Sequence, residues 1–197
     1  MEKPLDEGIG IDLDDTIANS SEHVLDMIKK RYDPNARIED WNQFDVTACF
    51  NITKEQSIRL FTEVWSKPEE IELVDERIPE IISKLSSAYK VFLLTATVGS
   101  RRFYEPWLEG HNIKFDGIIR VQRSIEKITT GSSFGINYYI DDHELVAKSV
   151  ASAGKKAILI KRPWNADFAD SVTDKNIRVV RSWEEIERLF SSPYRKI

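Results

Sequence analysis

Apolar residues along the chain fall into short segments that alternate with helix-like segments. In residues 8–13, Ile9, Ile11 and Leu13 alternate with small or polar residues, a pattern typical of a short buried strand. Later segments with the character of buried strands lie at 89–94, 117–121, 136–140, 157–160 and 178–180. Amphipathic helices are expected at 78–85, 102–109, 144–152 and 183–190. This alternation predicts an α/β fold with a doubly wound, Rossmann-like parallel sheet. Because the crossovers are right-handed, the carboxyl ends of all strands should lie at one edge.

Residues 20–76 interrupt this alternation, because no strand pattern is found among them. A first helix is expected to end near Tyr32, with Ser20 or Ser21 as its cap. Thr53 is expected to cap a second helix at 54–65. We therefore predict a core domain made of residues 1–19 and 77–197. Residues 20–76, called the cap segment below, are predicted to form a small helical insertion after the first strand.

The composition is that of an ordinary globular protein, with 41% apolar and 31% charged residues among 197. Cys49 is the only cysteine, so no intramolecular disulfide can form. The polar residues 1–7 are unlike a signal peptide, and no apolar run approaches the ~18 residues of a membrane span. We expect a cytoplasmic protein with no membrane partner. The net charge of −5 and the absence of a dense basic stripe argue against a nucleic-acid polymer as partner.

Carboxylates gather at the ends of two expected strands. Asp12, Asp14 and Asp15 follow the first strand, and Asp141 and Asp142 follow the strand at 136–140. Carboxylates this close repel one another unless a cation lies among them. In open parallel sheets, ligands bind at the carboxyl ends of the strands. An acidic turn or a helix cap would explain either group alone, but together they predict a site for a hard cation and a phosphate.

Two further side chains are expected at the same edge. Thr95 ends the strand at 89–94, and Lys127 lies between two expected strands. Thr95 alone is equally well explained as a helix cap, and Lys127 alone as a solvated surface lysine. The combined set contains a nucleophile, an acid, a hydroxyl donor, a cation and metal ligands, which is what phosphoryl transfer needs.

The order and spacing of these residues resemble the motifs of the haloacid dehalogenase-like (HAD-like) phosphohydrolases. The resembling residues are Asp12-Leu13-Asp14-Asp15-Thr16 for the first motif, Thr95 for the second, Lys127 for the third and Asp141-Asp142 for the fourth. The third is the weakest, since Arg120 and Arg123 are nearby competitors for Lys127.

The resemblance implies a Mg2+-dependent phosphomonoesterase that works through an aspartyl-phosphate. Asp12 would be the nucleophile, and Asp14 the general acid. Asp12, the backbone carbonyl of Asp14, and Asp141 or Asp142 would hold the Mg2+ ion. Thr95 and Lys127 would bind the phosphoryl oxygens of the substrate.

Within that superfamily the chain more closely resembles the 5'(3')-deoxyribonucleotidases, also called cytosolic type C 5'-nucleotidases. The length of the cap segment, the run from Lys127 to Asp142 and the tail segments 162–166 and 178–186 carry this resemblance. The chain departs from that family at three positions, Asp15, Ser20 and Ala96.

The closer resemblance implies a small-molecule substrate, a (deoxy)nucleoside monophosphate. Its base would stack on aromatic residues of the cap segment, for which Trp41, Phe44 and Trp65 are the candidates. A phosphatase for a sugar phosphate or phosphoglycolate is the alternative. The sequence leaves the oligomeric state open, a homodimer included.

Two other classes of protein share parts of the pattern. A haloacid dehalogenase needs no acid two residues after its nucleophile, so Asp14 argues against that reaction. A phosphorylated receiver domain, the alternative without enzyme activity, also uses Asp, Thr, Lys and an acidic pair. In receivers, however, the acidic pair lies on the first strand and the phosphorylated Asp on a later one, the reverse of the order here.

Overall fold

A six-stranded, fully parallel sheet forms the centre of the computed structural model, which describes residues 7–191. The strands are β1 (Gly8–Ile11), β2 (Lys90–Thr95), β3 (Gly117–Arg120), β4 (Ile136–Asp141), β5 (Lys156–Ile160) and β6 (Ile177–Val180). Their order is β3-β2-β1-β4-β5-β6, and every neighbouring pair is parallel. The predicted doubly wound Rossmann-like sheet is therefore confirmed. The strand order reverses at β1, the position where ligands bind in such sheets.

β1 is shorter than the expected strand at 8–13. Its backbone turns after Asp12, because the carbonyl of Leu13 accepts hydrogen bonds from the amides of Ile17 (2.9 Å) and Ala18 (3.0 Å). Asp15, in this turn, has a φ of 56°, in the left-handed region that non-glycine residues seldom adopt. The first carboxylates thus lie on a tight turn rather than on the strand.

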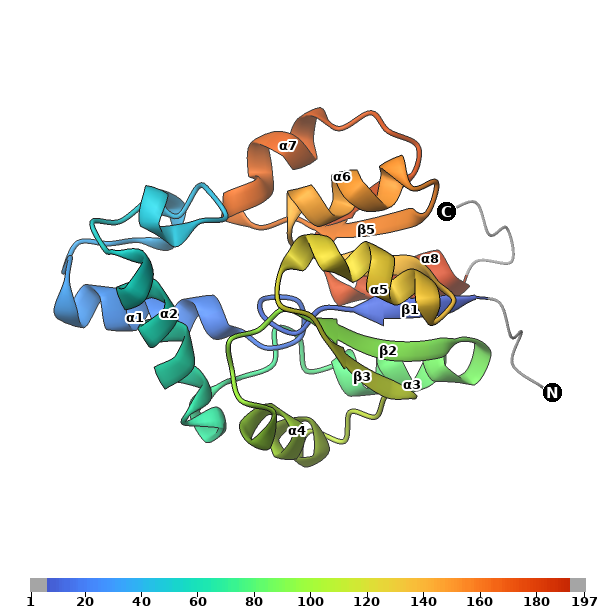
Figure 1. Cartoon of the computed structure of the whole chain (residues 1–197), viewed down its shortest axis with the longest axis horizontal. Helices are drawn as coiled ribbons and strands as arrows, with labels where there is room; N and C mark the ends of the chain where they lie inside the picture. The colour runs from blue at the N-terminus through green and yellow to red at the C-terminus, as the bar shows by residue number, and fades with distance from the viewer. Residues whose placement is uncertain (1–6, 192–197) are drawn as a thin grey trace.

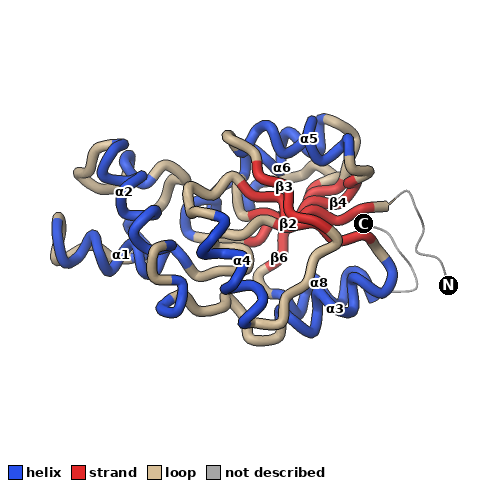
Figure 2. Tube along the Cα trace, turned by 60° about the horizontal axis from the view of Figure 1, so that its bottom comes forward, coloured by secondary structure: helices blue, strands red, loops and turns tan. Residues whose placement is uncertain are grey.

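Helices cover both faces of the sheet (Figure 2). α3 (Ile78–Ala88) and α8 (Trp183–Ser191) lie on one face, and α5 (Lys127–Ser133) and α6 (Glu144–Ser152) on the other. α4 (Arg101–Gly110) and α7 (Ala166–Ser171) lie at opposite sides of the molecule (Figure 1). The helices expected from the amphipathic pattern are therefore present, and their apolar sides form the core with the sheet.

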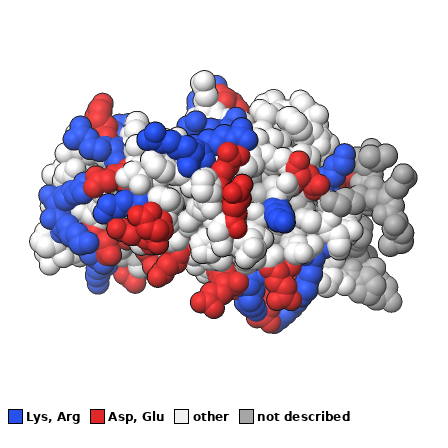
Figure 3. Space-filling model, turned by 90° about the horizontal axis from the view of Figure 1, so that it is seen from below, with Lys and Arg blue, Asp and Glu red and all other residues white. Residues whose placement is uncertain are grey.

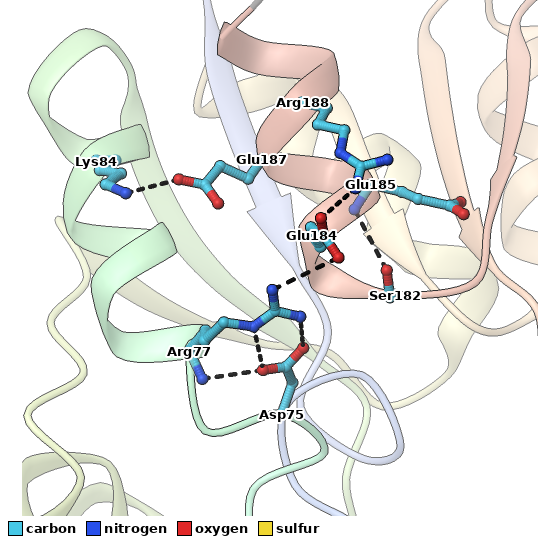
Figure 4. Close-up of polar contacts among 8 residues, drawn as sticks. All are labelled: Asp75, Arg77, Lys84, Ser182, Glu184, Glu185, Glu187 and Arg188. Atoms are coloured by element: carbon cyan, nitrogen blue, oxygen red, sulfur yellow. Dashed lines mark hydrogen bonds and ion pairs between the residues drawn. The ribbon is translucent and has the colours of Figure 1, made fainter.

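Ion pairs join α8 to α3, although the two helices are about 100 residues apart in sequence (Figure 4). Lys84 contacts Glu187 at 2.6 Å, and Arg77 contacts Glu184 at 3.7 Å. These side chains are partly exposed, and such pairs contribute only about 0–1 kcal/mol each. The fully buried Ile186 of α8 stabilises this packing more, since a buried aliphatic side chain contributes roughly 1.5–3 kcal/mol.

The cap segment forms helices that lie beyond the carboxyl ends of the strands (Figure 1). They are α1 (Ser20–Arg31) and α2 (Lys54–Trp65), with short 3-10 turns at Ile38–Asp40, Val46–Ala48 and Pro68–Glu70. The backbone just before this segment lies beside the backbone near its end, since Ala18 and Leu73 form an antiparallel bridge. This arrangement agrees with an insertion, while the boundaries 1–19, 20–76 and 77–197 stay a prediction.

The sequence predicted the N-terminal cap of α2 correctly but not that of α1. Thr53 caps α2 as expected, and it forms a reciprocal capping box with Gln56. The expected Ser cap of α1 is wrong, because Asn19 occupies the cap position and makes no side-chain capping bond. The carboxylate of Asp15 accepts a hydrogen bond from the amide of Ser21 (2.8 Å) instead.

Within residues 7–191, no helix combines the length and the apolar character needed to cross a membrane.

Candidate active site

The turn after β1 is held in place by side chains from the carboxyl-terminal third of the chain. Arg162 donates two hydrogen bonds to the backbone carbonyl of Asp15, at 3.0 and 2.6 Å. The indole of Trp183 donates to the carbonyl of Thr16 at 2.8 Å. These three bonds support the left-handed conformation of Asp15, whose own carboxylate accepts a hydrogen bond from the amide of Ser21 in the first turn of α1.

A buried lysine lies between carboxylates from two neighbouring strands. The Nζ atom of Lys127, the first residue of α5, is 2.8 Å from Asp12 and 2.7 Å from Asp141. Only 2% of the lysine side chain is exposed. The two arginines that were alternatives to Lys127 for the third motif have other partners. Arg120 donates to the carbonyl of Thr97, and Arg123 pairs with Glu126. The cation of the cluster is therefore Lys127.

Asp12, Asp141 and Asp142 each offer a carboxylate oxygen, and these oxygens lie within 4.8 Å of one another. Burial raises the pKa of Asp12 to about 6, against the opposing charge of Lys127. Burial and repulsion by Asp141 raise the pKa of Asp142 well above its usual value. The cluster thus holds three carboxylates and one ammonium group, which contacts two of them, and the excess negative charge suits a divalent cation. Oxygen donors of this kind fit Mg2+.

Asp142 is also held by the segment after β5. The indole of Trp164 donates to a carboxylate oxygen of Asp142 at 2.8 Å, and Asn165 donates to its backbone carbonyl at 2.7 Å. Sequence reasoning singled out residues 162–166 only as a resemblance and assigned them no contact. The available signal was their position, directly after the strand next to the one that carries Asp141 and Asp142.

Asp14 lies two residues after Asp12 and is held from the cap segment. Its Oδ1 atom accepts a hydrogen bond of 2.8 Å from the indole of Trp65. Burial raises the pKa of Asp14, and a hydrogen bond with Thr97 opposes this shift. A carboxyl group whose neutral form is favoured in this way is suited to donate a proton.

The two threonines after β2 have different positions. Thr95 is fully buried, and its hydroxyl oxygen accepts a hydrogen bond of 3.0 Å from the amide of Thr97, which leaves its own hydrogen free to donate. Thr97 lines the cavity described next, together with Ala96 and Val98, whereas Thr95 does not. Sequence reasoning missed Thr97, although it is a hydroxyl residue in the loop that follows a predicted strand.

A cavity of about 390 Å3 extends from the carboxylates to the cap segment. Four carboxylate residues of the core line it, Asp12, Asp14, Asp15 and Asp142. The rest of the wall is mainly apolar and comes mostly from the cap segment, with Trp41, Phe44, Val46, Ile58 and Phe61, and from Trp164. A substrate held at the carboxylates would therefore extend toward aromatic and aliphatic side chains.

The three predicted base-binding aromatics occupy three different environments. Trp41 lines the cavity but is only 3% exposed, since its ring packs against Phe50, Phe61 and Trp164. Phe44 lines the cavity, is 44% exposed and stacks on His143 with ring centroids 3.5 Å apart. Trp65 is fully buried and is not part of the cavity wall, so its ring offers no free face to a base. Trp41 and Phe44 remain the candidates.

No protein-family model and no curated protein matches the chain. Solved structures match it over almost its whole length. A HAD-like family hydrolase from Streptococcus pneumoniae has a TM-score of 0.68 and 16% identity, covering 93% of this chain and 98% of its own. A predicted phosphoglycolate phosphatase from Haemophilus somnus has a TM-score of 0.63 and 18% identity, covering 93% and 97%.

An L-2-haloacid dehalogenase from Xanthobacter autotrophicus has a TM-score of 0.59 and 8% identity, covering 94% of this chain and 98% of its own. Proteins with different reactions thus share this architecture, and the reaction has to be argued from the site. The chain has the fold of the HAD-like hydrolases.

Proposed function

We propose that the chain is a Mg2+-dependent phosphomonoester hydrolase that works through an aspartyl-phosphate. The observation that carries this proposal is the buried contact of Lys127 with Asp12 and Asp141, in a cluster whose Asp12 and Asp142 line the cavity. The proposed metal ligands are Asp12, the backbone carbonyl of Asp14, and Asp141 or Asp142. Bound Mg2+ would supply positive charge that offsets the repulsion between a carboxylate and a phosphate.

In the proposed reaction the residues of the chain have separate roles. The carboxylate of Asp12 attacks phosphorus, and the bond from phosphorus to the ester oxygen breaks as Asp14 transfers its proton to that oxygen. Asp14 then removes a proton from water, which attacks phosphorus, releases inorganic phosphate and regenerates Asp12. Lys127 and Thr95 are proposed to stabilise the charge on the phosphoryl oxygens. A halide needs no proton on leaving, so the position of Asp14 favours an ester over a haloacid.

The proposed substrate is a (deoxy)nucleoside monophosphate. The apolar wall beyond the carboxylates supports a leaving group with a flat, uncharged ring. Among the described residues of that wall, Lys54 is the only Lys or Arg, and it pairs with Asp45 at 3.7 Å. A second anionic group on the substrate, such as the carboxylate of phosphoglycolate, would have no other cation there. Likeness to a predicted phosphoglycolate phosphatase nevertheless makes a small phosphorylated acid or sugar the second candidate.

A small-molecule substrate also agrees with the distribution of surface charge. On the face seen in Figure 3, groups of Lys and Arg are interrupted by Asp and Glu. A nucleic-acid polymer would favour a continuous basic stripe.

We expect the purified protein to release inorganic phosphate from p-nitrophenyl phosphate repeatedly when Mg2+ is present. EDTA should abolish release and excess Mg2+ should restore it, because the carboxylate cluster then regains its cation. The measurement is phosphate per protein over time, repeated with nucleoside monophosphates, sugar phosphates and phosphoglycolate. Incorporation of a single phosphate without turnover would instead favour the receiver-like alternative.

The substrate proposal predicts a specific effect of changing Phe44 to Leu. Loss of the exposed ring at the cavity should raise the KM for a nucleoside monophosphate about tenfold, because stacking on a base contributes roughly 1–3 kcal/mol. Activity on a small alkyl phosphate should change little. Phe134→Leu is the matched control, since Phe134 is 50% exposed but is not part of the cavity wall. If Phe44→Leu and Trp41→Leu both leave the ratio of the two activities unchanged, the nucleotidase proposal fails.

A further inference from the structure

Trp65 connects the cap segment directly to a carboxylate of the proposed catalytic set. It is the last residue of α2, and its Nε1 atom donates a hydrogen bond of 2.8 Å to Oδ1 of Asp14. The two residues are 51 positions apart in sequence and belong to different parts of the fold. The indole N–H of a buried tryptophan usually finds a hydrogen-bond partner. Here that partner is the proposed general acid, Asp14.

Packing, and not the hydrogen bond alone, fixes the position of this indole. The ring of Trp65 makes edge contacts with Tyr104 and Trp107 of α4, with centroids 6.1 and 5.8 Å apart. Gly99 leaves the space that the ring occupies, since a Cβ atom there would lie 2.6 Å from Cγ of Trp65. The N–H group is therefore held in one direction before it bonds to Asp14.

A second indole bond in the same aromatic cluster is a useful comparison. Trp107 donates to the backbone carbonyl of Ile71 at 2.9 Å, also across the boundary between core and cap segment. It is 6% exposed and packs against Trp65, but its bond goes to the backbone and not to a carboxylate. The two tryptophans thus have similar packing and differ in whether the indole reaches Asp14.

We propose that Trp65 is a positioning residue that holds one carboxyl oxygen of Asp14, so that the other is oriented to carry the proton to the leaving group. This inference rests on the proposed function. It ties proton transfer to the cap segment, because the bond exists only while α2 lies against the core. A carboxyl on a short side chain rotates among several orientations, and the bond from Trp65, together with the hydrogen bond with Thr97, favours one of them.

The test is Trp65→Phe, which keeps a buried aromatic ring and removes the N–H donor. We expect kcat/KM for an alkyl phosphate to fall about tenfold. On p-nitrophenyl phosphate, whose leaving group needs no proton, the change should stay within about twofold. Trp107→Phe is the matched control, because it removes an indole N–H from the same cluster and keeps a ring against Trp65; it should change both activities by the same factor. Equal losses on the two esters in Trp65→Phe overturn the inference, and a parent protein inactive on both esters overturns the proposed function itself.

A double-mutant measurement separates positioning from a general effect on folding. Adding Trp65→Phe to Asp14→Asn should cause no further loss on the alkyl phosphate, since the proton donor is already absent. An additional tenfold loss would contradict the inference. Should Trp65→Phe not fold, as judged by its thermal unfolding, Gly99→Ala provides the second variant. The added methyl group must displace the ring, and the same selective loss on the alkyl ester is expected.

Discussion

Changing Asp12 to Asn is expected to reduce phosphate release at least about 1000-fold, with the fold retained. The amide cannot attack phosphorus, and it is a poorer ligand for Mg2+ than a carboxylate. The site should still assemble, because Lys127 keeps its contact of 2.7 Å with Asp141. The measurement is kcat on p-nitrophenyl phosphate with saturating Mg2+, together with the thermal unfolding midpoint.

Asp45→Asn is the control for loss of a negative charge at the same cavity. Asp45 lines the cavity, but 53% of its side chain is exposed; it pairs with Lys54 and accepts hydrogen bonds from the amide and hydroxyl of Thr47. Its replacement should change kcat less than about threefold. Activity of Asp12→Asn within about tenfold of the parent would refute the assignment of Asp12 as the nucleophile.

Changing Asp14 to Asn is expected to lower kcat/KM for an alkyl phosphate about 100-fold or more while largely sparing kcat/KM for p-nitrophenyl phosphate, because only formation of the aspartyl-phosphate depends on the leaving group. General acid catalysis contributes roughly 100- to 10,000-fold when the leaving group is a poor one. The amide oxygen of Asn can still accept the hydrogen bond from Trp65, so the local geometry should persist. The measurement is kcat/KM on both esters at the same pH.

Asp15→Asn is the matched control for this prediction, because Asp15 is the adjacent buried carboxyl but bonds to the amide of Ser21. Its replacement should affect both esters equally. The acid role of Asp14 would be disproved by equal losses on the two esters in Asp14→Asn.

Local patterns predicted the sheet because each strand carries its own signal. The burial of β1, β2 and β4 follows from runs such as Val91 to Leu94, and the parallel order follows from the helices between strands. The same reasoning predicted that Asp12 and Asp141 lie at one edge of the sheet, because both follow parallel strands. Lys127 was placed at this edge by its position between two expected strands and assigned to a motif by the resemblance, since nothing in its immediate sequence distinguishes a buried lysine from a solvated one.

Contacts between distant segments were not predictable in the same way. The bonds from Trp65 to Asp14 and from Trp164 to Asp142 depend on where whole helices and loops lie, and an indole N–H has no sequence periodicity. The Ser cap of α1 was wrong for a related reason. The rule for caps considers the residue next to the helix, whereas Asp15 reaches Ser21 from a turn six residues earlier.

The central position of β1 has a consequence for how the chain is made. This first strand pairs with β2 and β4, whose residues lie about 80 and 130 positions later in the sequence. At a synthesis rate of roughly 5–20 residues per second, the interval between synthesis of β1 and synthesis of both its neighbours is on the order of 6–25 s. During that interval its apolar residues are exposed to aggregation. Its Gly-Ile-Gly-Ile sequence is short and is followed by Asp12 and Asp14, features that oppose pairing with other chains. The acids of the proposed site would thus also protect the nascent chain while the sheet is incomplete.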